Sequence, residues 1–377
     1  MKLSDVDPLF TPKSVAVFGA SDSEDSVGGV IYRNMLDGGF KGPCYAVNPK
    51  YDRVAGQPSY EGLEALNKPV DLALIATPAS EVPGVLEQCG AAGAKMAVVY
   101  SAGFAEQGDT GAALQERLVE IARRNRIRVL GPNAMGVMRP QSGLNATFGV
   151  TAALRGNVAL VSQSGAVCSA MLDWSGARQV GFSTVVSLGA AADVDFGDVL
   201  DFLALDAHTQ SILLYVEGVR DARRFMSGLR AAARLKPVIV VKTGRYPAGS
   251  RAAKSHTGAW VGSAEVFRAV MERAGAVQVE ALDQLFAAAQ VFGTGKRLAG
   301  DRVAQQDQGG RGQPGRGLAG RRRDVGGVAD GHLQRIQRRQ AGRGELAADL
   351  VTGGPEPIDA QSHRRSLIAD GDDLPPV

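Results

Sequence analysis

Short apolar runs alternate with longer amphipathic stretches through the first third of the chain. The apolar runs, which predict β-strands, lie at residues 13–18, 44–47, 71–75, 95–100 and 128–130. The stretches with helical periodicity lie at residues 28–36, 60–66, 81–92 and 110–125. Because strands that alternate with helices form parallel βαβ units, we predict an α/β fold with a doubly wound, Rossmann-like sheet.

The same alternation restarts near residue 157. Predicted strands lie at residues 157–161, 183–187, 211–215, 237–242 and 277–279. Predicted helices lie at residues 166–175, 196–204, 222–234, 264–273 and 281–292. We predict a second doubly wound domain, which is flavodoxin-like rather than an extension of the first. The predicted boundaries are 1–145 for the first domain and 146–300 for the second.

The overall composition narrows the class of protein. Apolar residues make up 45% of the 377 residues and charged residues 21%, as in an ordinary globular protein. The formal net charge of +3 is too small to indicate nucleic-acid binding, and no apolar window is long enough to span a bilayer. The three cysteines have no metal-like spacing, so we expect free thiols and no metal site. These features predict a cytoplasmic protein.

The turns that follow the first two predicted strands indicate a ligand that carries phosphate. Gly19 opens a small-residue turn before a helix, where backbone N–H groups can bind an anion. The spacing of Gly19, Gly28 and Gly29 departs from the G-x-G-x-x-G motif of NAD-binding proteins. The second strand ends at Asn48 and Lys50, where those proteins place a ribose-binding acid. Lys50 fits coenzyme A and fits NADP less well, although a solvated surface lysine is the simpler alternative.

The second half of the chain offers a second anion site and a carboxylate. Residues 162–165, Ser-Gln-Ser-Gly, lie between a strand and a helix, where they supply an N-cap and leave helical N–H groups free. A plain cap without a ligand has the same pattern. Glu217 ends the third strand and is able to orient an imidazole, or it is simply solvated. Asp193 and Asp195 fit a capped loop better than a metal or nucleotide site.

His256 is one of only four histidines in the chain. It follows the predicted strand at 237–242 and a stretch at 243–254 that is rich in Gly, Ser and basic residues. The carboxyl end of a strand in an open α/β sheet is where ligands bind, and imidazole accepts and passes on groups near neutral pH. A surface histidine in a polar loop is the alternative for this residue alone.

Seven short motifs, taken in their order along the chain, resemble those of a known family. They are VFGAS at 17–21, AVNPK at 46–50, ATPA at 76–79, GPN at 131–133, VSQSGA at 161–166, YVEG at 215–218 and SHTGA at 255–259. Over about residues 3–300 the chain is similar to the nucleoside-diphosphate-forming acyl-CoA synthetases, the superfamily that contains the succinyl-CoA synthetase α subunit. The resemblance implies a CoA-binding Rossmann-like domain followed by a flavodoxin-like ligase domain.

The resemblance also implies roles for particular residues. His256 would be phosphorylated during turnover, Glu217 would steady the phosphohistidine, and the helix start would face the phosphoryl group through Ser162, Gln163, Ser164 and Gly165. The residues expected to bind coenzyme A are Gly19, Ala20, Ser21, Asn48, Pro49, Lys50, Thr77, Pro78 and Asn133. The implied reaction is acyl-CoA + ADP + phosphate ⇌ carboxylic acid + CoA + ATP.

The chain departs from the family in one respect: no nucleotide-binding module is found in its sequence. Family members bind the nucleotide with an ATP-grasp module, in the same chain or in a partner, and no such module is found in these 377 residues. We therefore expect an incomplete enzyme whose ATP or ADP, with Mg²⁺, is held by a partner subunit or domain. The expected substrate is a small carboxylic acid, and the expected assembly is an oligomer.

The last part of the chain has a different composition. Residues 305–377 contain no Phe, Tyr, Trp, Met, Cys, Lys or Asn, and Gly, Arg, Gln, Ala and Asp dominate. Such a segment cannot bury a core, so we expect residues 301–377 to be disordered. An Arg/Gly-rich RNA-binding segment is disfavoured, because it would need aromatic residues to stack on bases and this segment has none. A linker to a partner and an off-frame translation of a GC-rich gene remain, and we favour the second because the break falls inside a strand pattern at 300–304.

Two other functions compete with the ligase. A non-catalytic module that senses CoA or acyl-CoA, of the kind fused to protein acetyltransferases, would have the same two domains. It would need neither His256 nor Glu217, so their presence favours the ligase. An NADP-linked oxidoreductase is disfavoured by the glycine spacing and by the absence of an obvious residue for hydride chemistry.

Overall fold

The computed structural model describes residues 5–243 and 264–294. The expected loop around His256 and the tail from residue 301 lie outside the described residues, so what the sequence indicates for them stays a prediction.

The first sheet has the strand order of a Rossmann fold. Its strands are β1 (Val15–Phe18), β2 (Cys44–Val47), β3 (Arg53–Val54), β4 (Gln57–Tyr60), β5 (Leu72–Ile75), β6 (Met96–Val99) and β7 (Arg128–Leu130). The order is β3-β4-β2-β1-β5-β6-β7, and all pairs are parallel except the edge pair of β3 and β4. Without β3 this is the 3-2-1-4-5-6 arrangement of dinucleotide-binding folds. The predicted Rossmann-like sheet is confirmed.

The helices of this half are α2 (Val27–Asp37), α3 (Leu63–Leu66), α4 (Val82–Ala91) and α5 (Asp109–Asn125). Three of them match the predicted helices to within two residues. The helix predicted over residues 60–66 begins only at Leu63, because Ser59 and Tyr60 pair with β2 as part of β4. Backbone pairing with a neighbouring strand therefore prevails over the helical periodicity at this point.

The second sheet contains a flavodoxin-like parallel set and an additional hairpin. Its strands are β8 (Gly136–Arg139), β9 (Leu144–Thr147), β10 (Arg155–Ser162), β11 (Phe182–Ser187), β12 (Ser211–Val216), β13 (Val238–Lys242) and β14 (Val277–Val279). The order is β14-β13-β12-β10-β11-β8-β9. The five parallel strands follow the flavodoxin order 2-1-3-4-5, as predicted.

The hairpin of β8 and β9 was not predicted. The two strands pair with each other in antiparallel fashion, and β8 pairs in the same way with β11. They therefore belong to the second sheet by hydrogen bonding, and the predicted boundary after residue 145 passes through β9. The helices of this half are α6 (Gly165–Arg178), α7 (Phe196–Leu205), α8 (Ala222–Leu235), α10 (Ala264–Ala274) and α11 (Leu282–Gly293).

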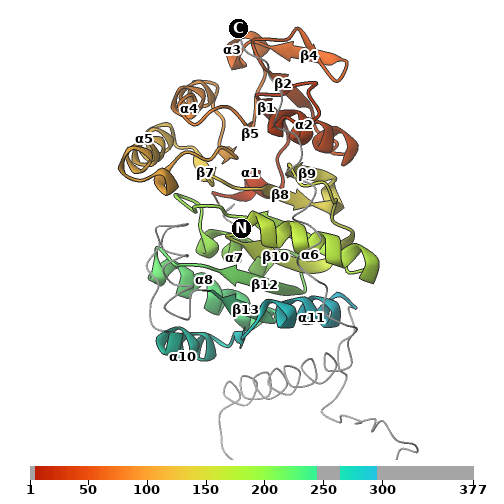
Figure 1. Ribbon diagram of the computed structural model, residues 1–377, viewed down its shortest axis with the longest axis vertical. Coiled ribbons are helices and arrows are strands. Elements are labelled where there is room, and N and C mark those ends of the chain that lie inside the picture. Colours follow the sequence, from red (N-terminus) through yellow and green to blue (C-terminus); the bar gives the residue numbers. More distant parts are fainter. Residues whose placement is uncertain (1–4, 244–263, 295–377) are drawn as a thin grey trace, which may run out of the picture.

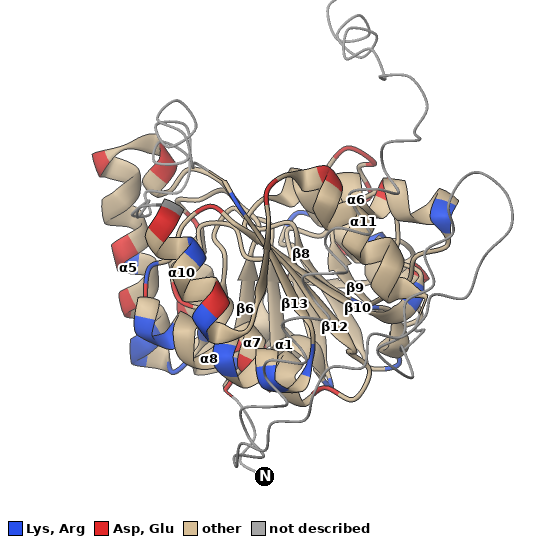
Figure 2. Cartoon of the chain, turned by 90° about the horizontal axis from the view of Figure 1, so that it is seen from below, with Lys and Arg blue, Asp and Glu red and all other residues tan. Residues whose placement is uncertain are grey.

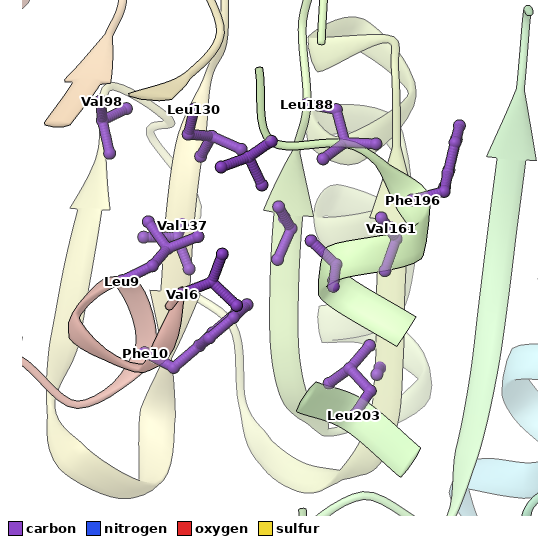
Figure 3. Packing of buried hydrophobic residues seen from close by; sticks show 14 of the residues in the cluster. Val6, Leu9, Phe10, Val98, Leu130, Val137, Val161, Leu188, Phe196 and Leu203 are labelled. Atoms are coloured by element: carbon purple, nitrogen blue, oxygen red, sulfur yellow. The ribbon is translucent and has the colours of Figure 1, made fainter. Parts of the chain in front are cut away.

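The two sheets share one of the hydrophobic clusters of the described residues. Figure 1 shows the first sheet above the second, with the short helix α1 (Asp7–Phe10) between them. Buried residues of both sheets, among them Leu130 and Val161, belong to one cluster with the apolar side chains of α1 (Figure 3). The ring of Phe10 stacks on that of Phe202 in α7, with 3.9 Å between the centroids. Burial of these side chains is the main stabilising term that joins the halves.

A backbone ladder also joins the halves. The N–H of Ala192 donates to the carbonyl of Gly131 at 2.9 Å. The N–H of Val194 donates to the carbonyl of Val129 in β7 at 3.0 Å. The segment that follows β11 therefore runs beside the last strand of the first sheet and occupies its free edge, which fixes the position of one sheet relative to the other.

Arg128 reinforces this ladder with an ionic cluster. Its guanidinium donates to the carboxylates of Asp193 and Asp198, each at 3.0 Å, and Arg224 also binds Asp198. Burial alone would lower the pKa of Arg128, but the hydrogen bonds and charges of the two carboxylates outweigh it and raise that pKa. Asp195 accepts two backbone N–H groups at the start of α7, which confirms the capped loop.

Charged residues lie on the helices and in the loops, whereas the strands carry few. Figure 2 shows blue and red bands on α5 and α10 and blue bands on α8, with the central strands almost entirely tan. Among the described residues, no helix is both long enough and apolar enough to span a membrane.

Replacing Arg128 should weaken the junction between the sheets. We expect Arg128→Met to lower the free energy of unfolding by about 3 kcal/mol, because two largely buried carboxylates lose their shared cation. Urea denaturation would measure the loss. The matched control is Arg124→Met, since the Arg124–Glu87 pair is more than half exposed and should contribute less than about 1 kcal/mol. Equal losses in the two variants would contradict this account of the junction.

Candidate functional site

A pocket of about 670 Å³ opens at the carboxyl ends of β1, β2 and β5. Strands β2 and β4 lie on one side of β1, whereas β5 and the strands after it lie on the other side. Ligands of doubly wound sheets bind at such a switch point. Helix α4 forms one wall, and Arg117 of α5 reaches the pocket from beyond it. The position and the lining therefore fit a nucleotide-like ligand.

Six of the nine residues predicted to bind coenzyme A line this pocket. They are Gly19, Asn48, Pro49, Lys50, Thr77 and Pro78. Ala20 and Ser21 do not line it: their side chains are buried behind the turn, with 0% and 7% of their surface exposed. Asn133 lies on a different turn, after β7. Ala20, Ser21 and Asn133 are therefore not part of the pocket wall.

The backbone of the first turn requires glycine. Gly19 has a φ of +81°, and a Cβ there would lie 2.7 Å from the carbonyl oxygen of Ala76. A Cβ on Gly28 would lie 2.0 Å from the carbonyl oxygen of Gly19. Helix α2 therefore packs directly on the turn, and only glycine allows the backbone to approach this closely.

The second turn is held to the first by a side chain. The amide group of Asn48 donates to the carbonyl of Ala20 at 2.8 Å, and its oxygen accepts the N–H of Lys50 at 3.0 Å. Asn48 therefore connects the turn after β1 to the turn after β2 and fixes the backbone position of Lys50. The hydroxyl oxygen of Thr77, on the opposite side, is buried and has no hydrogen-bond partner in the described part of the chain.

Sequence reasoning missed other polar groups of the pocket. Gln88 of α4 and Arg117 of α5 line it, together with Glu61 and Glu81. The helical pattern gives no sign of this, because α5 carries other arginines that lie outside the pocket. Only the packing of α5 beside α4 decides which of them faces the ligand space.

The second candidate site lies at the start of α6. Ser164 is the N-cap: its hydroxyl accepts the N–H of Val167 at 3.3 Å. The hydroxyl of Ser162 accepts the N–H of Ser164 at 3.0 Å. The cap leaves the first helical N–H groups, those of Gly165 and Ala166, directed out of the helix end. A fourteen-residue helix thus presents its positive end here.

Gln163 connects this helix start to Glu217. Its side-chain oxygen accepts the backbone N–H of Glu217 at 2.7 Å and that of Gly218 at 3.0 Å. Glu217 is 8% exposed, and the ammonium group of the buried Lys242 donates to its carbonyl at 2.8 Å. Glu217 and the helix start, predicted separately, are therefore neighbours in the structure. Lys242 is a further polar residue of this site that the strand pattern concealed.

A chain of hydrogen-bonded turns runs from the pocket to the second site. Ser101, after β6, donates its hydroxyl to the carbonyl of Thr77 and accepts the N–H of Asn133 at its own carbonyl, at 3.0 Å. Two residues further, the N–H of Met135 donates to the hydroxyl of Ser187 at 3.0 Å. A Cβ on Gly165 would lie 3.2 Å from that of Met135. Asn133 thus lies on the path between the two sites.

The protein's own thiols are poor candidates for chemistry. Burial raises the pKa of each of Cys44, Cys89 and Cys168 to about 12. At neutral pH these thiols are protonated and therefore weak nucleophiles. Among the described residues no group of three or more His, Cys, Asp or Glu side chains is arranged to hold a metal ion.

Two family models match the chain over these same regions. A CoA binding domain matches residues 13–140, and a succinyl-CoA ligase like flavodoxin domain matches residues 155–292. The first is the half that holds the pocket, and the second is the half that holds the start of α6.

Comparison with individual proteins gives the same result. The chain is 40% identical over 309 residues to acetate–CoA ligase [ADP-forming] I subunit alpha of Pyrococcus furiosus. The aligned region covers 81% of this chain and 67% of that protein. It is 45% identical over 278 residues to acetate–CoA ligase [ADP-forming] I of Archaeoglobus fulgidus. That aligned region covers 74% of this chain and 40% of that protein. The chain belongs to the ADP-forming acyl-CoA ligase family and spans less than half the length of the second relative.

Solved structures support the assignment of the fold. Acetyl-coenzyme A synthetase 1 of Ca. Korarchaeum cryptofilum, solved in complex with phosphate and ADP, matches with a TM-score of 0.73 and 39% identity. The match covers 76% of this chain and 62% of that chain.

Removing the side-chain oxygen of Gln163 should loosen the second site. In Gln163→Met two N–H groups lose their acceptor, which costs about 1–3 kcal/mol for each buried group. We expect hydrogen exchange at the amides of Glu217 and Gly218 to accelerate at least about tenfold, the equivalent of about 1.4 kcal/mol. The amides of β5, in the other sheet, are the internal control. Unchanged protection at Glu217 and Gly218 would contradict the role given to Gln163.

Proposed function

We propose that this chain is the CoA-binding and phosphohistidine-carrying part of an ADP-forming acid–CoA ligase. The observation that carries the proposal is the continuous line of turns that leads from the pocket at β1 and β5 to the start of α6. The carboxyl ends of β5 and β7 are two strand spacings apart, about 10 Å. An extended pantetheine arm is able to cover that distance.

The first half of the reaction would take place between these two sites. The nucleotide part of acyl-CoA would bind in the pocket, and its thioester would lie near the start of α6. Phosphate would bind to the free N–H groups of that helix end, which favour an anion. A phosphate oxygen would attack the thioester carbonyl carbon, the C–S bond would break, and acyl phosphate and CoA would form. The helix end would stabilise the negative charge on the phosphoryl group.

The second half of the reaction would pass the phosphoryl group to His256. A neutral imidazole nitrogen would attack phosphorus, and the carboxylate would leave as the free acid. The chain enters the segment that contains His256 directly after β13, whose last residue, Lys242, contacts the backbone of Glu217. Glu217 would accept a hydrogen bond from the second ring nitrogen and steady the charged phosphohistidine.

The nucleotide would be held by an ATP-grasp module in a partner subunit or domain, with Mg²⁺. One of the relatives is a subunit alpha, and another has a chain of which this one spans only 40%. Both facts support a further module as a requirement for turnover. The acid is a small carboxylic acid in the proposal, and the relatives include acetate and 4-hydroxybutyrate ligases.

Phosphorylation of His256 tests this function. The chain is incubated with a cognate ATP-grasp subunit, Mg²⁺ and γ-³²P-labelled ATP, and protein-bound label is counted after acid and base treatment. We expect label that is stable to base, labile to acid and absent in His256→Ala, because the P–N bond of a phosphohistidine resists base and is hydrolysed by acid.

His208 is exposed and precedes β12, so it lies at the opposite end of that strand from Glu217. It supplies the control variant His208→Ala, which should keep the label. Label that survives in His256→Ala would contradict the proposal. Binding of CoA without any label in the wild type would support a sensing module instead.

A further inference from the structure

The pocket at β1 and β5 has two cations on its walls that come from distant parts of the chain. Lys50 follows β2, and Arg117 lies in α5. The carboxylates of the pocket, Glu61 and Glu81, are exposed, and within the described part of the chain no ion pair joins either of them to Lys50 or Arg117. Both cations are therefore available to a ligand.

The two cations lie in different parts of the pocket. The backbone N–H of Lys50 is bound by Asn48, whose amide group also holds the Gly19 turn, so Lys50 belongs to the turns at the sheet edge. Arg117 is eight residues into α5, about 12 Å along the helix from its start. Because α5 runs away from that edge, Arg117 lines the pocket at a distance from the two turns.

These positions predict which end of the ligand each cation meets. The thiol end must leave along the sheet edge, past Ser101 and Asn133, to reach the second site. The pyrophosphate would then lie at the Gly19 turn near Lys50, and the nucleoside end would stay outside, beside α4 and α5. In coenzyme A that outer end carries the 3′-phosphate, and a guanidinium group matches a phosphate with two parallel hydrogen bonds.

We propose that Arg117 recognises the 3′-phosphate of coenzyme A and is the residue that distinguishes coenzyme A from 3′-dephospho-CoA. This inference rests on the proposed function, since it assumes that coenzyme A occupies the pocket. Lys50 contributes to both ligands equally, because both carry the pyrophosphate.

Calorimetric titration of the full chain with each ligand tests the assignment. We expect Arg117→Gln to weaken binding of coenzyme A about tenfold and to leave binding of 3′-dephospho-CoA unchanged. Lys50→Gln should weaken both ligands by a similar factor. Arg117→Lys keeps the positive charge but loses the two parallel hydrogen bonds of a guanidinium group, so it should retain part of the preference for coenzyme A.

Arg123→Gln is the matched control, because it removes the same charge from an exposed position of the same helix outside the pocket lining. It should bind both ligands as the wild type does. An equal effect of Arg117→Gln on the two ligands, or none on either, would overturn the assignment of Arg117 while leaving the proposed function intact. A wild-type chain that binds neither ligand would overturn the proposed function and this inference with it.

Discussion

The ladder between β7 and the segment after β11 is the constraint on which the rest of the structure depends. Two half-molecules with their own sheets could in principle rotate against each other. Here the N–H groups of Ala192 and Val194 complete the edge of the first sheet, and Arg128 binds two carboxylates of the second half. The common core around α1 adds the apolar contact area (Figure 3). The relative position of the two sheets is therefore fixed by directional bonds as well as by hydrophobic packing.

That fixed position gives the proposed chemistry its geometry. A thioester held by the first half reacts with phosphate held by the second only if the two binding sites keep a constant separation, because a small displacement of the reacting atoms is costly in rate. The turns from Thr77 through Ser101 to Asn133 define the path, and Met135 closes it against the start of α6. The ionic cluster at Arg128 is at the opposite end of β7 from these turns.

Most of the parallel strands and long helices could be predicted from the sequence, because fully buried strands are apolar runs and surface helices keep a clear period. The hairpin of β8 and β9 was missed because neither strand is an apolar run: β8 begins at Gly136, which has a positive φ, and ends at Arg139, and β9 has the sequence LNAT. Sequence order also could not show that Gln163 binds Glu217, or that Arg117 faces the pocket while Arg123 does not. Those relations arise from packing between elements distant in the chain. The structural surroundings of His256 are likewise beyond what its motif alone could give.

The most direct test of the central claim uses this chain without any nucleotide. Acetyl-CoA and ³²P-labelled phosphate are added to the chain alone, and released CoA thiol and protein-bound label are measured together in a single turnover. If the two sheets hold both reactants, CoA release will depend on phosphate and will match up to one equivalent of label on His256. CoA release that is independent of phosphate, or no label on the protein, would contradict the account.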